Sequence, residues 1–463
     1  MKLNTLVNPS IKWERIVSRR YSSLFMMLLF TAVVFLSSCK TGFVPELPSL
    51  PSAEKVQTTH IAYPILLLHG LGQKSHVWDD QAVRFYQNEM GLAYGGVLSM
   101  KNGKANLDAK YNGSGDFFTV SFTNSSDSIA TWGRELEQYV NLVRQKTKAD
   151  KVILIGYSMG GVASRYYLTH HVKNHNVVRL ITIGSPHLGS PFARIYKLKA
   201  GIVSKLKENP NPVTATILKG ALSTVEAAES DVPFDAPAMH DLMRPEDGGT
   251  FLDALNKSEH PGDVEYVCVV GDVDVASEVQ KLNTTAVQEI LRRAVEFFDS
   301  GLSAVFSTGD GVVSSYSQTL NNIAYFKNNP SRQRLTRTVT LSSLHTEHLR
   351  NSNEIQRVTL EDKPEFKSAE FYGYDGKPCL VIDFSDYLPP QKSTVTVTYP
   401  SLTGERTITA SDVQLIRKPN NDVVCRAIIP LPDADYSSAF DAQISITNYF
   451  SNKITTSKRW NGK

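Results

Sequence analysis

The chain has 463 residues, in which 49 Lys and Arg nearly balance 46 Asp and Glu and leave a formal charge of +3. Its sequence contains no long run of basic residues that could follow a phosphate backbone, so we do not expect nucleic acid as a partner. The hydrophobic content of 41% is ordinary for a globular protein, and the length exceeds one average domain. We therefore expect a large core domain and a smaller module.

The N-terminal segment has the pattern of an export signal. Five basic residues precede the apolar run LFMMLLFTAVVFL, which is too short to cross a bilayer comfortably. The run leads into LSSC, which resembles the lipobox of bacterial lipoproteins, where the peptide is cut before an acylated cysteine. We expect a signal peptide at 1–38, lipidation of Cys39, a Pro- and Ser-rich tether at 39–58 and a protein anchored in the bacterial cell envelope. The alternative is a short uncleaved anchor with an incidental cysteine.

Export would expose the remaining cysteines to an oxidising compartment. Cys268 lies inside an apolar strand-like run and is expected in the core. Cys379 and Cys425 both fall in the C-terminal region and could form a disulfide, although the sequence does not establish their geometry.

Beyond the tether, continuous apolar runs alternate with helical patterns. The runs are typical of buried parallel strands, and they lie at 61–70, 117–122, 151–156, 177–184, 264–271 and 336–343. Between the second and third runs, Ile129, Trp132 and Leu136 recur at helical spacing with charged residues between them. This alternation predicts an α/β fold with a mostly parallel sheet over residues 59–362.

Two stretches depart from this alternation. Residues 188–262 are helix-like but broken by prolines, where a connection between strands should be short, so we expect a helical cap or lid there. Residues 363–463 contain short β-branched runs separated by Pro, Asn, Asp and Gly, which predicts a small all-β, sandwich-like module.

The candidate catalytic residue is Ser158, in the sequence GYSMGG. This GxSxG pattern follows the apolar run KVILIG and precedes a helical pattern, as in a sharp strand-to-helix turn that lifts a serine hydroxyl clear of a sheet. Such a serine needs an acid and then a histidine further along the chain. Asp310, in the sequence GDGVV, and His345, directly after the last strand-like run, appear in that order.

With these partners, the sequence resembles the lipase and esterase branch of the α/β-hydrolases, including bacterial triacylglycerol lipases and, more distantly, GPI inositol-deacylase-like proteins. The resemblance rests on HGLG, GYSMGG, GSPHLGSP, GDGVV and HTEHLRNSNEI, and it covers about residues 60–360. It implies that Ser158 is the nucleophile, Asp310 the acid and His345 the base. It also implies that the backbone N–H groups of Leu71 and Met159 form the oxyanion hole.

Several positions have alternatives. His348 lies three residues after His345 and is the alternative base, because the family tail can be aligned on either histidine. Asp272 and Asp274, which follow the run VEYVCVVG, are reserve candidates for the acid. His69 precedes the oxyanion loop and is expected to order it.

The expected function is therefore hydrolysis of carboxylic esters, as a lipase or esterase acting on acyl lipids through an acyl-enzyme. An acyltransferase or thioesterase on the same fold is an alternative, and so is a membrane-anchored binding or scaffold lipoprotein with an inactive hydrolase domain. The eleven histidines show no HExxH or similar ligand spacing, and the triad chemistry needs no ion, so we expect no metal and no cofactor.

Overall fold

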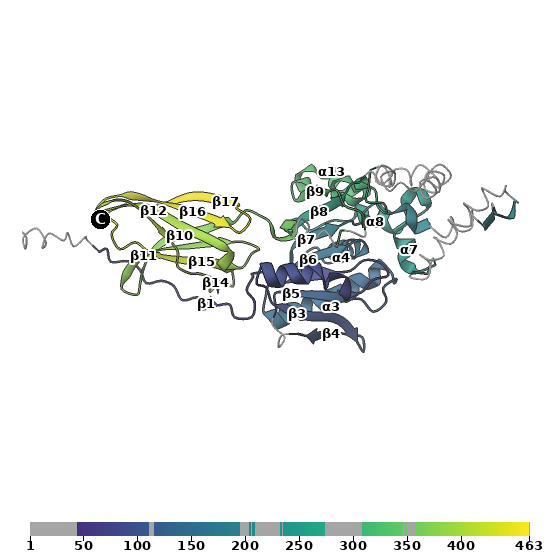
Figure 1. Ribbon diagram of the computed structural model, residues 1–463, viewed down its shortest axis with the longest axis horizontal. Coiled ribbons are helices and arrows are strands. Elements are labelled where there is room, and N and C mark those ends of the chain that lie inside the picture. Colours follow the sequence, from purple (N-terminus) through teal and green to yellow (C-terminus); the bar gives the residue numbers. More distant parts are fainter. Residues whose placement is uncertain are drawn as a thin grey trace, which may run out of the picture.

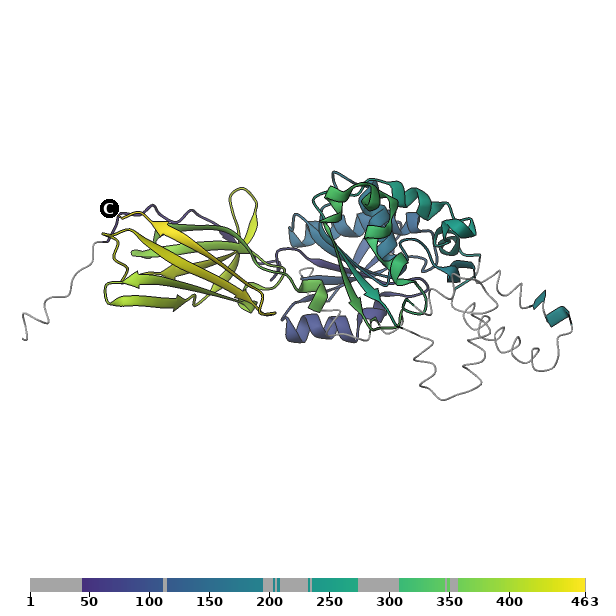
Figure 2. The same ribbon diagram turned by 90° about the horizontal axis from the view of Figure 1, so that it is seen from above.

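A computed structural model describes residues 44–110, 115–194, 203–204, 206–208, 232–233, 235–273, 308–345, 348–349 and 357–462. The predicted signal peptide, Cys39 and Asp274 lie outside the described residues, as does much of the predicted cap. In Figures 1 and 2 the described chain forms two bodies placed end to end, one built on a sheet covered by helices and the other all β.

The first body is built on an eight-stranded sheet in the order β4-β3-β5-β2-β6-β7-β8-β9. β3 and β4 pair antiparallel, and the other neighbours pair parallel. The strands are β2 (Ile65–Leu68), β3 (Tyr94–Lys101), β4 (Lys104–Ala109), β5 (Phe117–Ser121), β6 (Val152–Tyr157), β7 (Val177–Ile183), β8 (Glu265–Gly271) and β9 (Thr336–Leu341). The mostly parallel α/β sheet predicted from the apolar runs is confirmed.

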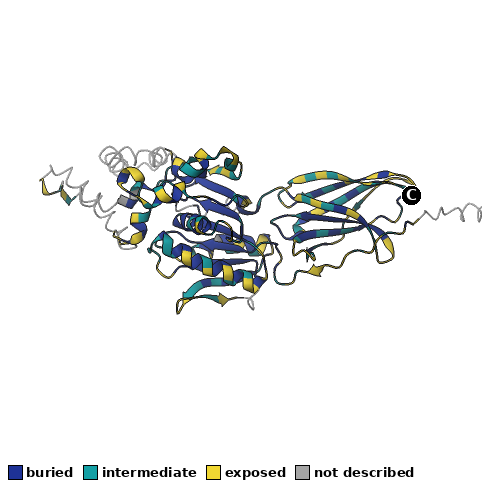
Figure 3. Ribbon diagram, turned by 180° about the vertical axis from the view of Figure 1, so that it is seen from behind, coloured by how far each residue is buried: buried dark blue, intermediate teal, exposed yellow. Residues whose placement is uncertain are grey.

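Helical segments cover both faces of this sheet, and Figure 3 shows its central strands as buried. On one face, α3 (Ile129–Thr147) and α4 (Met159–His170) pack over Leu66 and Leu154. On the other face, η1 (Ser75–Trp78), α2 (Gln81–Arg84) and η2 (Phe85–Glu89) pack over Ile153 and Ile155. The side chains of successive β6 residues thus point into the cores on opposite faces of the sheet. Because both faces are buried, the residues of a central strand are apolar throughout.

Short helical segments lie in the connections. They are η3 (Pro191–Arg194), α7 (Pro237–Asp241), η4 (Pro245–Asp247), α8 (Phe251–Lys257), α12 (Ser315–Gln318), η5 (Leu320–Asn322), α13 (Ala324–Asn328) and α14 (Pro330–Gln333). The described parts of the predicted cap contain the helical segments η3, α7, η4 and α8, and α7 lies at the end of the α/β body away from the β module (Figure 1).

The second body consists of two antiparallel sheets, ordered β1-β14-β15-β11-β10 and β13-β12-β16-β17. The strands are β1 (Glu54–Lys55), β10 (Glu365–Tyr374), β11 (Lys377–Ser385), β12 (Ser393–Ser401), β13 (Gly404–Thr409), β14 (Val413–Arg417), β15 (Val423–Pro430), β16 (Phe440–Asn448) and β17 (Lys453–Trp460), with η7 (Pro390–Lys392) between β11 and β12. Both sheets contribute to one apolar core, as expected for a sandwich. The end of the predicted tether is part of this module, because β1 pairs with β14.

The pairing of β11 with β15 shows why the suggested disulfide does not form. Cys379 lies opposite Pro430, whereas Cys425 lies opposite Phe384. The two cysteines are therefore offset by about five residues, or about 17 Å, far beyond the reach of a disulfide. Both are buried free thiols, so the disulfide interpretation is wrong.

The junction between the two bodies is organised by Arg179, whose side chain is fully buried at the start of β7. Its guanidinium donates to Glu265 of β8 at 2.8 and 2.9 Å and to Asp362 at 2.7 Å. The guanidinium also lies 4.1 Å from the centre of the Tyr387 ring, which belongs to the β module. The module thus abuts the amino ends of the parallel strands and leaves their carboxyl ends free.

Asp386, next to this junction, makes the stability of the module pH-dependent. Burial raises the pKa of Asp386 to about 6, although Asn448 and the Leu388 N–H donate hydrogen bonds to its carboxylate. The folded chain therefore binds this proton more tightly than the unfolded chain, in which the pKa of an aspartate is about 4. The stabilising contribution is complete below pH 4 and is lost as the pH rises through 6.

We expect Asp386→Asn to become progressively more stable relative to the wild type between pH 4 and pH 7, by about 2 to 3 kcal/mol in free energy of unfolding. Urea unfolding of both proteins across this range measures the difference. Asp441→Asn, at an exposed carboxylate, is the matched control and should show no such trend. A constant difference between Asp386→Asn and the wild type would contradict the assignment.

Candidate active site

Ser158 occupies the sharp turn between β6 and α4. Its backbone φ of +52° lies in the left-handed region, which is strained for a residue other than glycine and is typical of functional positions. A Cβ at Gly156 would lie 2.4 Å from the Gly161 nitrogen, and a Cβ at Gly160 would lie 2.5 Å from the His69 oxygen. The two glycines of the motif therefore permit the close approach of helix and strand that the turn requires.

The three residues predicted to act together lie in one hydrogen-bonded chain. The Oγ of Ser158 is 3.0 Å from Nε2 of His345. Nδ1 of the same imidazole is 2.7 Å from Oδ2 of Asp310. A neutral imidazole with its proton on Nδ1 would donate to the carboxylate and accept from the serine hydroxyl, which is the arrangement that a general base needs.

Asp310 is almost fully buried, in the loop before α12. Its Oδ1 accepts hydrogen bonds from the backbone N–H groups of Val312 and Val313, at 3.0 and 2.7 Å. Burial alone would raise the pKa of Asp310. Electrostatic attraction and hydrogen bonds from His345 and His348 outweigh the effect of burial, and they lower the pKa well below its usual range. The carboxylate is therefore ionised across the range in which proteins are stable.

The main chain of His345 is also fixed, by contacts that the sequence did not reveal. Its backbone N–H donates to the carbonyl oxygen of Asp310 at 2.8 Å. Its carbonyl oxygen accepts from the hydroxyl of Tyr157 at 2.8 Å. Tyr157 directly precedes Ser158 in the GYSMGG motif, and nothing in that motif indicates this contact. Here its side chain positions His345.

His348 does not lie beside the serine. Its Nε2 is 3.2 Å from Oδ2 of Asp310, and its ring centre is 5.9 Å from that of His345. Among the described residues, no hydrogen bond joins His348 to Ser158, so the geometry favours His345 over His348 as the base. Asp272 is exposed at the end of β8 and makes no bond to either histidine within the described chain.

The loop after β2 brings Leu71 to the site. His69 is buried, and its Nδ1 donates to the Gly70 oxygen at 2.8 Å while its Nε2 accepts from the Phe122 N–H at 3.3 Å. Burial lowers the pKa of His69 to about 4, so the ring is neutral at pH 7. Its two hydrogen bonds fix the backbone next to Leu71, and Met159 opens α4 directly after Ser158. Both predicted oxyanion residues therefore adjoin the serine.

A cavity of about 250 Å³ opens over the serine. Ser158, His345, Tyr157, Gln73 and Ser190 supply its polar lining. The apolar lining consists of Leu71, Pro186, Ala193, Met239, Leu242 and Val312 with Val313. Met239 belongs to α7, which is held in place because the Ile129 N–H donates to Asp241 at 2.7 Å. The described part of the predicted cap thus forms an apolar wall facing the serine.

The comparison with known families agrees with this arrangement. Residues 61–233 match the family model described as "PGAP1-like alpha/beta domain". The first body has the fold of an α/β-hydrolase, and the predicted resemblance to the lipase and esterase branch is confirmed.

Two curated relatives of the hydrolase domain are triacylglycerol lipases. That of Burkholderia plantarii is 29% identical over 171 residues, which are 37% of this chain and 40% of the relative. That of Pseudarthrobacter phenanthrenivorans is 30% identical over 156 residues, which are 34% of this chain and 41% of the relative. The chain thus spans about two fifths of the length of these relatives. Among solved structures, the mature lipase BlEst2 of Bacillus licheniformis aligns with 66% of this chain and 91% of its own, at 18% identity and a TM-score of 0.36.

His187, in the GSPHLGSP segment of the hydrolase domain, has a structural role. Its Nδ1 lies 3.2 Å from the guanidinium of Arg165, which is fully buried on α4. Arg165 also donates to Asn256 of α8 at 2.8 Å, and Asn256 donates to the His187 carbonyl oxygen at 2.9 Å. Burial lowers the pKa of Arg165 to about 9. This cluster joins α4, α8 and the segment after β7 behind the nucleophile.

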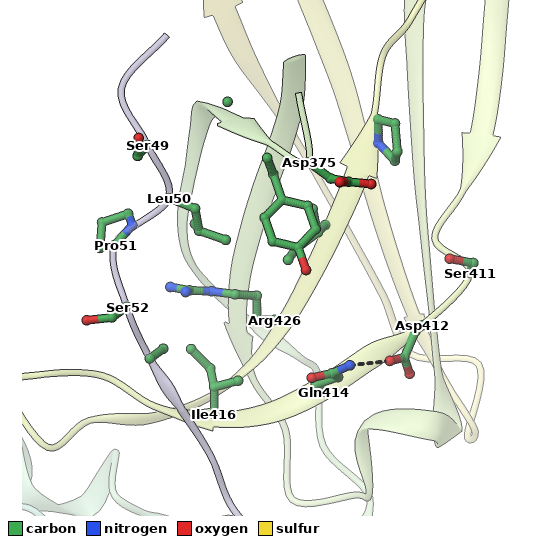
Figure 4. Close-up of a pocket in the computed structure, with 15 residues that line it drawn as sticks. Ser49, Leu50, Pro51, Ser52, Asp375, Ser411, Asp412, Gln414, Ile416 and Arg426 are labelled. Carbon is green, nitrogen blue, oxygen red and sulfur yellow. Dashed lines mark hydrogen bonds between the residues drawn. The ribbon is translucent and has the colours of Figure 1, made fainter. Parts of the chain in front are cut away.

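Another cavity, larger than the one over Ser158, lies in the β module. It has a volume of about 720 Å³ and lies between residues 49–53 and the outer face of the β14–β15 pair. Figure 4 shows Arg426 extending between Leu50 and Gln414, with Asp412 hydrogen-bonded to Gln414. Its described lining includes Asp375, Asp412 and Arg426, and none of the residues of the hydrogen-bonded chain at Ser158 belongs to it.

Asp310, His345 and His348 also form a group whose donor atoms all lie within 4.8 Å of one another, close enough to share a metal ion. The donor atoms that face one another are already joined by hydrogen bonds at 2.7 and 3.2 Å. The three side chains are thus joined by hydrogen bonds through Asp310, and His345 continues the chain to Ser158.

Proposed function

We propose that the protein is a serine hydrolase that cleaves carboxylic esters through an acyl-enzyme. The observation that carries the proposal is the continuous chain from Ser158 to His345 to Asp310 beside an apolar cavity. The resemblance of residues 61–233 to lipases and esterases supports the same reaction class.

In the first half-reaction, Ser158 Oγ attacks the ester carbonyl carbon while Nε2 of His345 takes the hydroxyl proton. Asp310 holds the imidazole in the required tautomer and stabilises the imidazolium that forms. The N–H groups of Leu71 and Met159 would bind the oxyanion of the tetrahedral intermediate. When this intermediate collapses, the carbon–oxygen bond to the alcohol breaks, and His345 returns the proton to the departing alkoxide.

In the second half-reaction, His345 removes a proton from water, which attacks the acyl-enzyme carbonyl. The second tetrahedral intermediate releases the carboxylic acid and restores the Ser158 hydroxyl. The structure also contributes rigidity, because the backbone and ring of His345 are fixed before substrate binds. A base held in place in this way needs little reorganisation when charge develops, which is a usual source of large rate enhancements.

The lining of the cavity indicates the substrate class. Seven apolar residues line the cavity around the serine, and its described lining contains no Asp, Glu, Lys or Arg. Burial of an acyl chain against them would stabilise the complex by about 25 cal/mol for each Å² of apolar surface removed from water. We therefore propose an acyl ester with an apolar chain as the substrate, and the membrane as the place where it is met if Cys39 is lipidated.

A panel of p-nitrophenyl esters from acetyl to palmitoyl tests this proposal. We expect turnover with a kcat/KM that rises from acetyl to longer chains, because each buried methylene contributes about 0.8 kcal/mol until the cavity is filled. Ser158→Ala supplies the background rate. A preference for acetyl over every longer chain would contradict an apolar acyl site, and equal rates for the wild type and Ser158→Ala would contradict hydrolysis by this serine.

The alternative of a binding or scaffold lipoprotein predicts no turnover at all. Anchoring through Cys39 remains a proposal, since that residue lies outside the described part of the chain. Among the helices of the described residues, none is long and apolar enough to span a membrane. Metabolic labelling with an alkyne fatty acid, comparing the wild type with Cys39→Ser, tests the anchor independently of the enzyme activity.

A further inference from the structure

The carboxylate of Asp310 receives more hydrogen bonds than a Ser-His-Asp chain needs. Oδ1 accepts from two backbone N–H groups, of Val312 and Val313. Oδ2 is approached by two imidazoles, from His345 at 2.7 Å and from His348 at 3.2 Å. A carboxylate offers about four lone-pair sites, so His348 completes the set.

The fold leaves a slot for the His348 ring. A Cβ added at Gly271, the last residue of β8, would lie 2.5 Å from the Cε1 atom of that ring. A Cβ added at Gly184, directly after β7, would lie 2.9 Å from its Cδ2 atom and 3.1 Å from its Nε2 atom. Any larger side chain at these two positions would displace the ring. The ends of two neighbouring central strands therefore accommodate His348, which is fully buried between them.

The hydrogen bonds also determine the protonation of His348. The Asp310 carboxylate can only accept, so Nε2 must carry a hydrogen to make the bond. Among the described residues, no group pairs with Nδ1, and this atom is buried. The geometry thus places a donating hydrogen on Nε2.

We propose that His348 is a positioning residue that holds the Asp310 carboxylate in the plane and orientation in which it meets His345. Its role in catalysis rests on the proposed function. With Oδ1 held by backbone and Oδ2 held by His348, the carboxylate cannot rotate away from Nδ1 of His345. The base is therefore oriented from both sides, by Asp310 at its ring and by Tyr157 at its carbonyl oxygen.

A pair of substitutions separates hydrogen bonding from packing. His348→Leu removes the donor and retains an apolar side chain in the slot. His348→Gln retains an amide N–H that can reach the same oxygen. We expect kcat for a soluble ester to fall about 10- to 100-fold in His348→Leu with KM unchanged, because a small misplacement of a catalytic group costs up to this much. We expect His348→Gln to recover most of the loss.

Two results would overturn the proposal. Wild-type kcat in His348→Leu would mean that the bond has no effect on the base. Equal losses of kcat in both variants, with circular dichroism spectra like that of the wild type, would mean that the ring acts by shape alone. His171→Leu, at a partly exposed histidine after α4, is the control for a histidine substitution outside the site.

A spectroscopic readout decides the same question even if the protein hydrolyses no ester. Selective ¹⁵N labelling of histidine, with signals assigned by their loss in His348→Gln and His345→Gln, reports which ring nitrogen carries the proton. We expect His348 to be protonated on Nε2, and this proton signal to move in Asp310→Asn. A proton on Nδ1 alone, or a signal unaffected by Asp310→Asn, would refute the contact, whereas failure of the proposed function alone would leave the expected signals intact.

Discussion

Ser158→Ala should remove nearly all ester hydrolysis, with kcat lowered by as much as about 10⁶-fold, as is typical for loss of a serine nucleophile. The reason is that, among the described residues, no other hydroxyl is hydrogen-bonded to the imidazole ring of His345. The substitution deletes a single oxygen at a half-buried position, so the fold should be retained. Initial rates on a soluble ester, followed at high enzyme concentration, measure the residual activity.

Ser164→Ala is the matched control for this prediction. Ser164 lies on the same helix and is buried, and its hydroxyl donates to the Gly160 carbonyl oxygen at 2.8 Å. Because it does not touch the reacting groups, its loss should change stability slightly and leave kcat near that of the wild type. Appreciable turnover by Ser158→Ala would assign hydrolysis to another residue.

Asp310→Asn should lower kcat by about 10⁴-fold, through the tautomer of His345 rather than through loss of the fold. The amide oxygen of the asparagine would face the N–H groups of Val312 and Val313, as Oδ1 does in the wild type. The amide NH₂ would then face Nδ1 of His345, which could only accept. The imidazole proton would move to Nε2, where it would point at Ser158 and prevent the ring from acting as a base.

Asp272→Asn provides the comparison for the acid. This residue follows β8 in the sequence, as a candidate acid should, but its side chain is exposed and outside the hydrogen-bonded chain. We expect its kcat to equal that of the wild type. Stopped-flow or steady-state measurements on the two variants would contradict the assignment of the acid if Asp272→Asn lost activity and Asp310→Asn kept it.

Much of the fold was predictable because the central strands are buried on both faces. Strands such as β6, with Ile153 facing one core and Leu154 the other, must be continuously apolar, and this pattern is readable in a single sequence. The hairpin of β3 and β4 was not predicted from the sequence. It lies at the edge of the sheet, its β4 residues are mostly exposed or half-buried, and its sequence therefore has no apolar run.

The candidate site divides in a similar way. Ser158 could be found because its turn constrains neighbouring residues to glycine, and the chain order of its partners indicated Asp310 and His345. The roles of Tyr157, His348 and Gln318 could not be found, since each depends on contacts between residues far apart in sequence. Gln318, for example, ties the loop of Asp310 to the end of β8 through hydrogen bonds with Gly271 and Val313. Such side chains matter because of contacts that form only in the folded chain, and no local sequence pattern identifies them.

The most direct test of the account is covalent labelling of the protein with a fluorophosphonate probe, followed by intact mass and peptide mapping. The probe reacts with a serine whose hydroxyl is activated by a neighbouring base, and it requires no knowledge of the natural substrate. We predict one adduct per chain, located on Ser158, absent from Ser158→Ala and strongly slowed in Asp310→Asn. A folded wild type that remains unlabelled, with or without detergent, or an adduct that persists in Ser158→Ala, would contradict the proposal that this serine is a catalytic nucleophile.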